Sequence, residues 1–171
     1  MRGLFLLGRL RIVQERYADA RCIYDWLLHK YGDRTETLLN LAKSYDMLCF
    51  WDRSEETYRR VLDKEPDNVK AMLGLSTIAV QRHDPATVHE WADKALAVQP
   101  GTIQALSNKA FAYLQDRDFG NGWPLYEHGA GHLKYRQVRS YIGEPRWQGE
   151  MGEDVRLLVH SEQGIGDQIA E

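Results

Sequence analysis

The residues best suited to chemistry lie near the end of the chain, around Gly164, Gly166 and Asp167. A short apolar run at residues 155–160 precedes them and predicts a buried strand. A strand, a glycine-containing loop and the start of a helix form the opening of a βαβ unit. Its glycines let a ligand approach the backbone, and its helix N-terminus favours an anion. The alternative is a tight strand-to-helix turn in which Asp167 caps the helix.

A second pair of chemically capable side chains, His128 and His132, has the four-residue spacing at which two ligands can share a metal on a helix. Gly129 and Gly131 weaken a helix there, and no third ligand is evident, so an exposed pair is the simpler interpretation. The sequence holds no Walker loop, His-Glu-x-x-His or Cys-x-x-Cys motif. We therefore predict no metal and no cofactor.

Composition narrows the classes of partner. The 171 residues include 22 basic and 25 acidic side chains, and this net charge of −3 requires no basic face for nucleic acid. No apolar run approaches the roughly 20 residues that a membrane-spanning helix needs. Two cysteines, Cys22 and Cys49, cannot form a disulfide framework, which favours a cytoplasmic location. We expect a protein or peptide partner, no nucleic acid and no membrane span.

Internal repetition indicates which elements organise the chain. Pro66 and Pro100 mark one fixed period, since each is followed by a turn-forming residue and a new apolar-periodic stretch. A shift by the interval between these two prolines aligns one large apolar column and two mostly small ones: Leu4, Leu38, Met72, Leu106; Gly8, Ala42, Ser76, Ala110; Ala20, Ser54, Val88, Gly122. Each unit predicts two antiparallel helices with small residues where they cross. One hairpin cannot bury its apolar face alone, so successive hairpins must stack.

These columns resemble the tetratricopeptide (TPR) repeat family over about residues 1–128. The resemblance implies an all-α fold, a right-handed α-solenoid of about four hairpins, with units 1–34, 35–68, 69–102 and a divergent 103–136. It also implies that the first helices of the hairpins line a concave groove. The residues expected there are Phe5, Arg9, Leu39, Asn40, Lys43, Met47, Lys70, Leu73, Thr77, Ser107, Asn108 and Phe111. Such a mixture suits an extended peptide or a neighbouring domain, and a solvated helix face is the alternative.

Asn40 and Asn108 occupy the sixth position of their repeats. In the TPR superhelix of O-GlcNAc transferases, asparagines in that column hold peptide backbone, since an amide offers both donor and acceptor. Leu6 and Gly74 fill the column in the other two repeats, so half of it matches.

The C-terminal part resembles a second family, the glycosyltransferase-like domains of GT-B fold that bacterial and phage proteins join to TPR repeats. The resemblance is carried by Trp123 and Tyr126-Glu127, by Pro145-x-Trp147-x-Gly149-Glu150, and by the loop Glu162-Gln163-Gly164-Ile165-Gly166-Asp167. It implies that Gly164, Gly166 and Asp167 line the acceptor side of a cleft. Asp167 would be the general base for an acceptor hydroxyl. Glu162 and Gln163 would orient the loop or touch a ligand.

Together the two resemblances divide the chain into a TPR array at residues 1–136, a linker at 137–152 and the start of an incomplete α/β domain at 153–171. Because the chain stops at Glu171, the lobe that carries the nucleotide-sugar site in this family is missing. We therefore expect no enzyme in this chain, and a nucleotide sugar only in a full-length version. The favoured hypothesis is a TPR interaction module. The rivals are the acceptor-recognition portion of a glycosyltransferase-like enzyme and a fragment without a function of its own.

Overall fold

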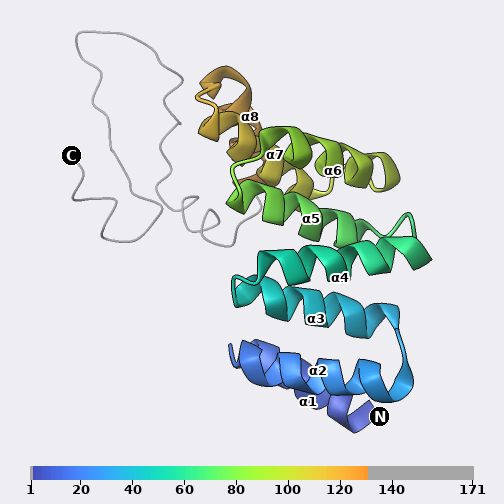
Figure 1. The fold of residues 1–171 in the computed structure, drawn as a ribbon. Helices are drawn as coiled ribbons and strands as arrows, with labels where there is room; N and C mark the ends of the chain where they lie inside the picture. The colour runs from blue at the N-terminus through green and yellow to red at the C-terminus, as the bar shows by residue number, and fades with distance from the viewer. Residues whose placement is uncertain (1, 131–171) are drawn as a thin grey trace, which may run out of the picture. The chain divides into compact units, whose positions relative to one another are not determined.

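The computed structural model describes residues 2–130, and all of its regular elements are helices. Figure 1 shows them stacked in chain order: α1 (Arg2–Val13), α2 (Tyr17–Tyr31), α3 (Thr35–Met47), α4 (Trp51–Lys64), α5 (Val69–Gln81), α6 (Pro85–Val98), α7 (Ile103–Gln115) and α8 (Phe119–Ala130). We call the odd-numbered helices A helices and the even-numbered ones B helices. Each A helix is followed by its B helix, so the described part contains four hairpins. The predicted all-α stack of helix hairpins is confirmed for these residues.

The helices repeat with the period of the sequence. A helices begin at residues 35, 69 and 103, and B helices begin at residues 17, 51, 85 and 119, so both sets advance by the interval that separates the two prolines. Helices α4 and α6 end at Lys64 and Val98, shortly before Pro66 and Pro100. Proline ends a helix there because it lacks an N–H donor and disfavours helical backbone in the residue before it.

The turn inside each hairpin repeats as well. Glu15, Cys49, His83 and Arg117 have φ angles between 55° and 61°, a left-handed conformation that costs a non-glycine residue about 1–2 kcal/mol. In every turn the next residue donates its backbone N–H to a carbonyl near the end of the A helix; the bond from Arg16 to Arg11 measures 2.8 Å. This pair of features is the Schellman motif, which satisfies the last carbonyls of the A helix and reverses the chain.

The apolar core lies between successive hairpins. Leu38 of α3, Val61 of α4 and Ile78 of α5 are fully buried in one cluster. Helix α5 has more buried residues than any other described helix, and it contacts α3, α4, α6 and α7. Its residues 71–76 are all buried in succession. The stacking that a single hairpin requires is therefore present between all the neighbours described.

Small residues stand where the paired helices cross. In the second hairpin the Ser54 hydroxyl donates to the Ala42 carbonyl at 2.9 Å, and in the third the Ser76 hydroxyl donates to the Val88 carbonyl at 3.3 Å. In the fourth, a Cβ atom on Gly122 would lie only 2.7 Å from a methyl carbon of Leu114. Val88, the largest member of its column, is nevertheless fully buried, because it packs against the small Ala79 and Ala112.

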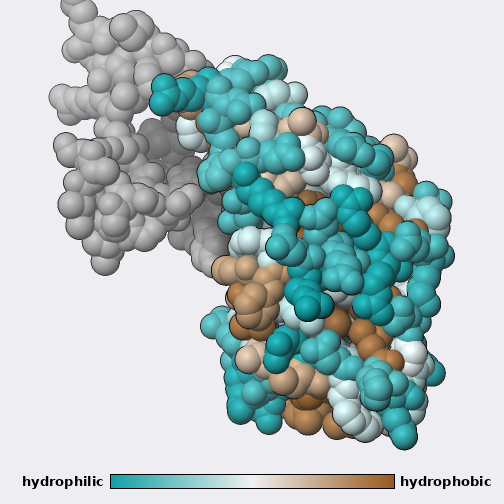
Figure 2. Space-filling view, viewed as in Figure 1, coloured by the Kyte–Doolittle hydropathy of each residue, from teal (hydrophilic) through white to brown (hydrophobic). Residues whose placement is uncertain are grey.

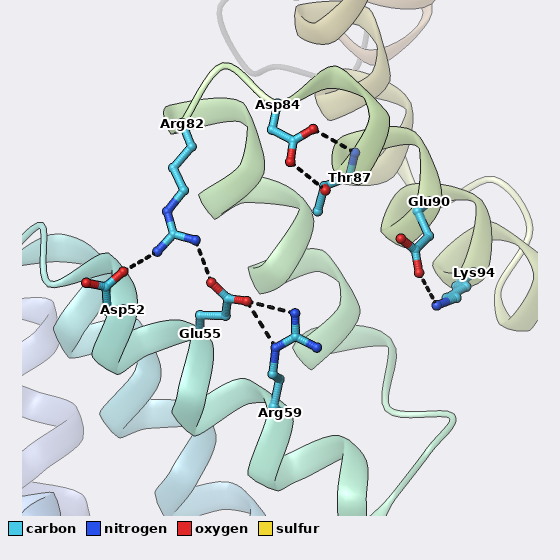
Figure 3. Close-up of polar contacts among 8 residues, drawn as sticks. All are labelled: Asp52, Glu55, Arg59, Arg82, Asp84, Thr87, Glu90 and Lys94. Carbon is cyan, nitrogen blue, oxygen red and sulfur yellow. Dashed lines mark hydrogen bonds and ion pairs between the residues drawn. The ribbon is translucent and has the colours of Figure 1, made fainter.

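An ion-pair network joins the second and third hairpins. Arg82, directly after α5, lies 2.5 Å from Asp52 and 2.5 Å from Glu55 of α4, and Glu55 also accepts from Arg59 (Figure 3). The hydrogen bond from Arg59 is the main cause that lowers the pKa of Glu55. Exposed pairs of this kind contribute at most about 1 kcal/mol each. The network therefore orients α4 against the α5–α6 turn more than it stabilises the stack.

The predicted linker at residues 137–152 and the predicted α/β start at 153–171 lie outside the described residues. None of the helices described is both long enough and apolar enough to cross a membrane.

Candidate binding surface on the A helices

Contacts between A helices define one side of the stack. Helix α1 contacts α3, α3 contacts α5, and α5 contacts α7, whereas α2 with α4, and α4 with α6, make no comparable contact. Because the A helices approach one another more closely than these B helices do, the stack of α1–α7 bends toward its A side. The A helices therefore line the inner side, as stacked helix hairpins do when they form a concave binding surface.

All twelve residues expected in the groove lie on A helices, but they differ in exposure. The exposed ones are Arg9, Lys43, Met47, Lys70 and Phe111; the half-buried ones are Phe5, Leu39, Asn40, Thr77 and Ser107; the buried ones are Leu73 and Asn108. The exposed set combines cationic and large apolar side chains on α1, α3, α5 and α7. These five are the most exposed of the twelve.

Leu73 is one of the two residues expected in the groove that are buried. Its side chain is 8% exposed and belongs to a cluster with Ala92 and Ala95 of α6 and Ala105 of α7. Helix α7 packs on α5 and helps to enclose this position.

Asn108 ties two A helices together. Its side-chain amide nitrogen donates to the Thr77 hydroxyl at 3.2 Å, and Gln104, also on α7, donates to the same oxygen at 3.3 Å. Thr77 in turn donates to the Leu73 carbonyl within α5 at 2.9 Å. Asn40 likewise uses its amide nitrogen inside the protein, as a donor to the Glu36 carbonyl at 2.8 Å. In this structure both asparagines therefore serve as internal donors.

Asp46 forms a polar cluster with two residues of α4, Ser54 and Tyr58. The Tyr58 hydroxyl donates to the Asp46 carboxylate at 2.9 Å, and the Ser54 hydroxyl shares its one proton between this carboxylate and the Ala42 carbonyl. Burial raises the pKa of Asp46 to about 6, although the two hydrogen bonds and the charge of Lys43 act in the opposite direction. Burial also raises the pKa of Tyr58. Sequence reasoning missed this cluster.

Comparison with the preceding repeat gives a sequence signal for this cluster. Ile12 occupies the position of Asp46 in the preceding repeat, and Tyr24 occupies that of Tyr58. The Tyr24 hydroxyl is therefore buried without a hydrogen-bond partner. Burial raises the pKa of Tyr24 to about 12. Asp46 is polar where the preceding repeat has the apolar Ile12, and this difference is the sequence signal that indicates the Asp46 cluster.

A pocket of about 600 Å³ opens where α1, the end of α2 and the start of α3 meet. Phe5 and Arg9, both predicted for the groove, line it together with Leu27 and Tyr31 of α2 and residues 34–37. The repeat pattern could not predict this pocket, because its walls combine two A helices with a B helix and an inter-hairpin turn.

Within the residues described, no group of three or more His, Cys, Asp and Glu side chains could hold a metal ion. The side chains of His128 and His132, the ligand-loop residues Glu162, Gln163, Gly164 and Gly166, and the candidate base Asp167 lie outside the described part.

No family model matches the chain. Over 98 residues, which are 56% of the chain, it is 30% identical to cellulose synthase operon protein C of Pseudomonas fluorescens. The match spans only 8% of the length of that protein.

Several solved structures are similar to this chain in fold. A thermophilic TPR protein from Thermus thermophilus has a TM-score of 0.71 at 14% identity, over 82% of this chain and 78% of that one. A TPR protein from Parabacteroides merdae has a TM-score of 0.67 at 18% identity, over 81% of this chain and 53% of that one. MamA from Desulfovibrio magneticus has a TM-score of 0.63 at 15% identity, over 82% and 85%. Together with four hairpins in one fixed register, these likenesses show that residues 2–130 have the fold of the tetratricopeptide repeat proteins.

Proposed function

We propose that this chain is a protein-interaction module that binds an extended peptide or the surface of a partner domain along its A helices. The observation that supports this function best is the set of exposed cationic and apolar side chains on the inner side of the stack: Arg9, Lys43, Met47, Lys70 and Phe111. Apolar anchors among polar groups are typical of peptide-binding grooves.

The hydrogen bonds between A helices support the same function. Thr77, Gln104 and Asn108 hold α5 and α7 in a fixed relation without a ligand. A surface that is already ordered loses less conformational entropy when it binds, so more of the contact energy contributes to affinity.

The proposal can be tested with peptides selected from a random display library, whose affinities are then measured by fluorescence anisotropy. The double variant Lys43→Glu with Lys70→Glu is expected to weaken the selected peptides about tenfold, which corresponds to about 1.4 kcal/mol. Lys30→Glu is the matched control, because Lys30 is an exposed lysine on the B helix α2. Equal binding by the double variant and the control would show that the α3 and α5 part of the A-helix surface does not bind these peptides.

The glycosyltransferase-related hypothesis rests on Trp123 and on residues 145–167, almost all of which the structure does not describe. None of the four proteins compared above is named as a transferase. We therefore retain the interaction module as the proposed function, with a cytoplasmic location as part of the same proposal.

A further inference from the structure

The pocket at the N-terminal hairpin has an apolar floor. Phe5 packs edge-to-face on the buried Tyr24 ring, with 5.9 Å between ring centroids, and Leu27 beside it is 3% exposed. Tyr31 lines the pocket while it packs against Trp26 at 6.0 Å. Figure 2 shows apolar surface over this hairpin, at the lower end of the view. A pocket of about 600 Å³ with such a floor can hold one large apolar side chain.

The rim of the pocket is positively charged. Arg2 and Arg9 of α1 and Arg34 before α3 line it, and no described carboxylate forms an ion pair with any of the three. Glu36 is the acidic side chain among the lining residues. By contrast, Arg16 at the turn of the same hairpin is paired with Asp19.

The excess of positive charge is local to this end of the stack. Helix α1 carries three arginines and no acidic residue, although the chain as a whole has a net charge of −3. Arginine binds carboxylates through two parallel hydrogen bonds, and such charge-assisted bonds are roughly twice as strong as neutral ones. An unpaired arginine beside an apolar floor is therefore suited to a ligand with carboxylates next to an apolar side chain.

We propose that this pocket binds an acidic peptide segment that carries one large apolar anchor, Phe or Leu, between its carboxylates. This inference rests on the proposed function and specifies the ligand class at the N-terminal end of the same surface. The anchor enters the space above Phe5 and Leu27, and the flanking carboxylates pair with Arg9 and Arg34. A nucleic acid fits less well, because three cations around one pocket do not form a continuous basic track in an acidic chain.

The test uses fluorescence anisotropy with four labelled probes on the full chain. The first is a decapeptide of alternating Glu and Ser with one central Phe, and the second replaces each Glu by Gln. The third replaces Phe by Ser, and the fourth is an oligothymidine. We expect the first probe to bind at least about tenfold more tightly than each of the others at low salt. Its affinity should fall as salt screens the ion pairs.

The matching variants are the double substitution Arg9→Gln with Arg34→Gln and the control Arg16→Gln on the same hairpin. The double variant should lose about tenfold or more in affinity for the acidic probe, and the control less than about twofold. Circular dichroism of each variant checks that the helices are intact. Equal affinity for the Glu and Gln probes, an unaffected double variant, or tighter binding of oligothymidine would each overturn the proposal.

The same measurements separate this inference from the proposed function. Library peptides that lose affinity with Lys43→Glu and Lys70→Glu, but not with Arg9→Gln and Arg34→Gln, would support the A-helix surface and refute the pocket. Binding that depends on the two arginines alone would support the pocket and restrict the binding surface to the first hairpin.

Discussion

Tyr24 and Tyr58 occupy the same place in neighbouring repeats and differ in one hydrogen bond. The Tyr58 hydroxyl donates to Asp46, whereas the Tyr24 hydroxyl is buried without a partner. Removal of a hydroxyl that donates to a carboxylate costs about 1.5–3 kcal/mol, and removal of an unpaired buried hydroxyl is neutral or stabilising by about 1 kcal/mol. We therefore expect Tyr58→Phe to lower the free energy of unfolding in urea, and Tyr24→Phe to leave it unchanged or raise it. A similar loss in both variants would contradict the difference between the two sites.

The raised pKa of Asp46 makes stability depend on pH. In the unfolded chain the carboxyl has its ordinary pKa of 3.8, and in the folded protein burial raises it to about 6. Between pH 3.8 and 6 the folded state holds a proton on Asp46 that the unfolded state has lost. The resulting gain in the free energy of unfolding is therefore full below pH 3.8. It is lost as the pH rises toward 6. The loss is on the order of 2–3 kcal/mol and is complete above pH 6.

Asp46→Asn lacks this dependence because its amide does not titrate. The difference in free energy of unfolding between wild type and variant, measured by urea unfolding from pH 3.5 to 7, should change steeply between about pH 4 and 6 and be flat above that range. Parallel curves for the two proteins would show that Asp46 has an ordinary pKa in the folded state.

At the scale of single elements, the four hairpin turns each hold one non-glycine residue in a left-handed backbone conformation. Cys49 has φ of 59°, and glycine adopts that conformation without the penalty of about 1–2 kcal/mol. We expect Cys49→Gly to raise the melting temperature in a calorimetric scan. Cys22→Gly is the control, since Cys22 is an exposed cysteine inside α2, where glycine costs about 0.5–1 kcal/mol. The two substitutions should therefore act in opposite directions, and a common sign would refute the role of the turn.

Two glycines of α1 permit a similar comparison. A Cβ atom on Gly8 would lie 2.7 Å from the Tyr24 ring, whereas one on Gly3 would meet no atom within 4 Å. Gly8→Ala should destabilise the protein by about 1–3 kcal/mol, since the buried ring has to move. Gly3→Ala should stabilise it by up to about 1 kcal/mol, because alanine favours the helix. Thermal unfolding followed by circular dichroism measures both, and a stable Gly8→Ala variant would mean that the ring can shift freely.

The helices were predictable from the sequence because each repeat contains its own turn residues and its own pattern of apolar and small residues. Pro66, Pro100 and the columns of small residues predict one helix hairpin per period, and the helices begin in that register. The left-handed turn residues could not be predicted, because Cys49 and its equivalents are not glycine and carry no turn signal of their own.

The binding surface was less predictable than the fold. The repeat pattern identified which positions lie on A helices, but exposure there depends on the next hairpin, which is a full repeat away in the sequence. Leu73 is buried by that neighbour, and Asn108 is engaged by Thr77 of the preceding A helix. The pocket beside Arg34 combines two A helices, a B helix and a turn, and no single-repeat pattern contains that combination.

At the scale of the whole described stack, contacts connect each hairpin mainly to its neighbours. Helix α1 contacts α2 and α3, whereas α5 contacts helices on both sides. Stability in such arrays is approximately a sum of terms for each repeat and each interface, so the end hairpin opens more easily than the middle. Hydrogen exchange followed by mass spectrometry should therefore show faster exchange in α1 than in α5. Equal protection of the two helices would indicate one all-or-none unit.

The contacts between A helices also have a mechanical consequence. The A helices α1, α3, α5 and α7 contact one another in sequence, whereas α2 with α4, and α4 with α6, make no comparable contact. The A side of the stack is therefore closely packed, and the B side has more room to open. Further bending toward the A side meets packed side chains, and bending away must break bonds such as the one between Asn108 and Thr77. The inner side of the stack is therefore expected to keep a nearly fixed length. A ligand must then space its own side chains to match the distances between successive A helices, because these distances change little on binding.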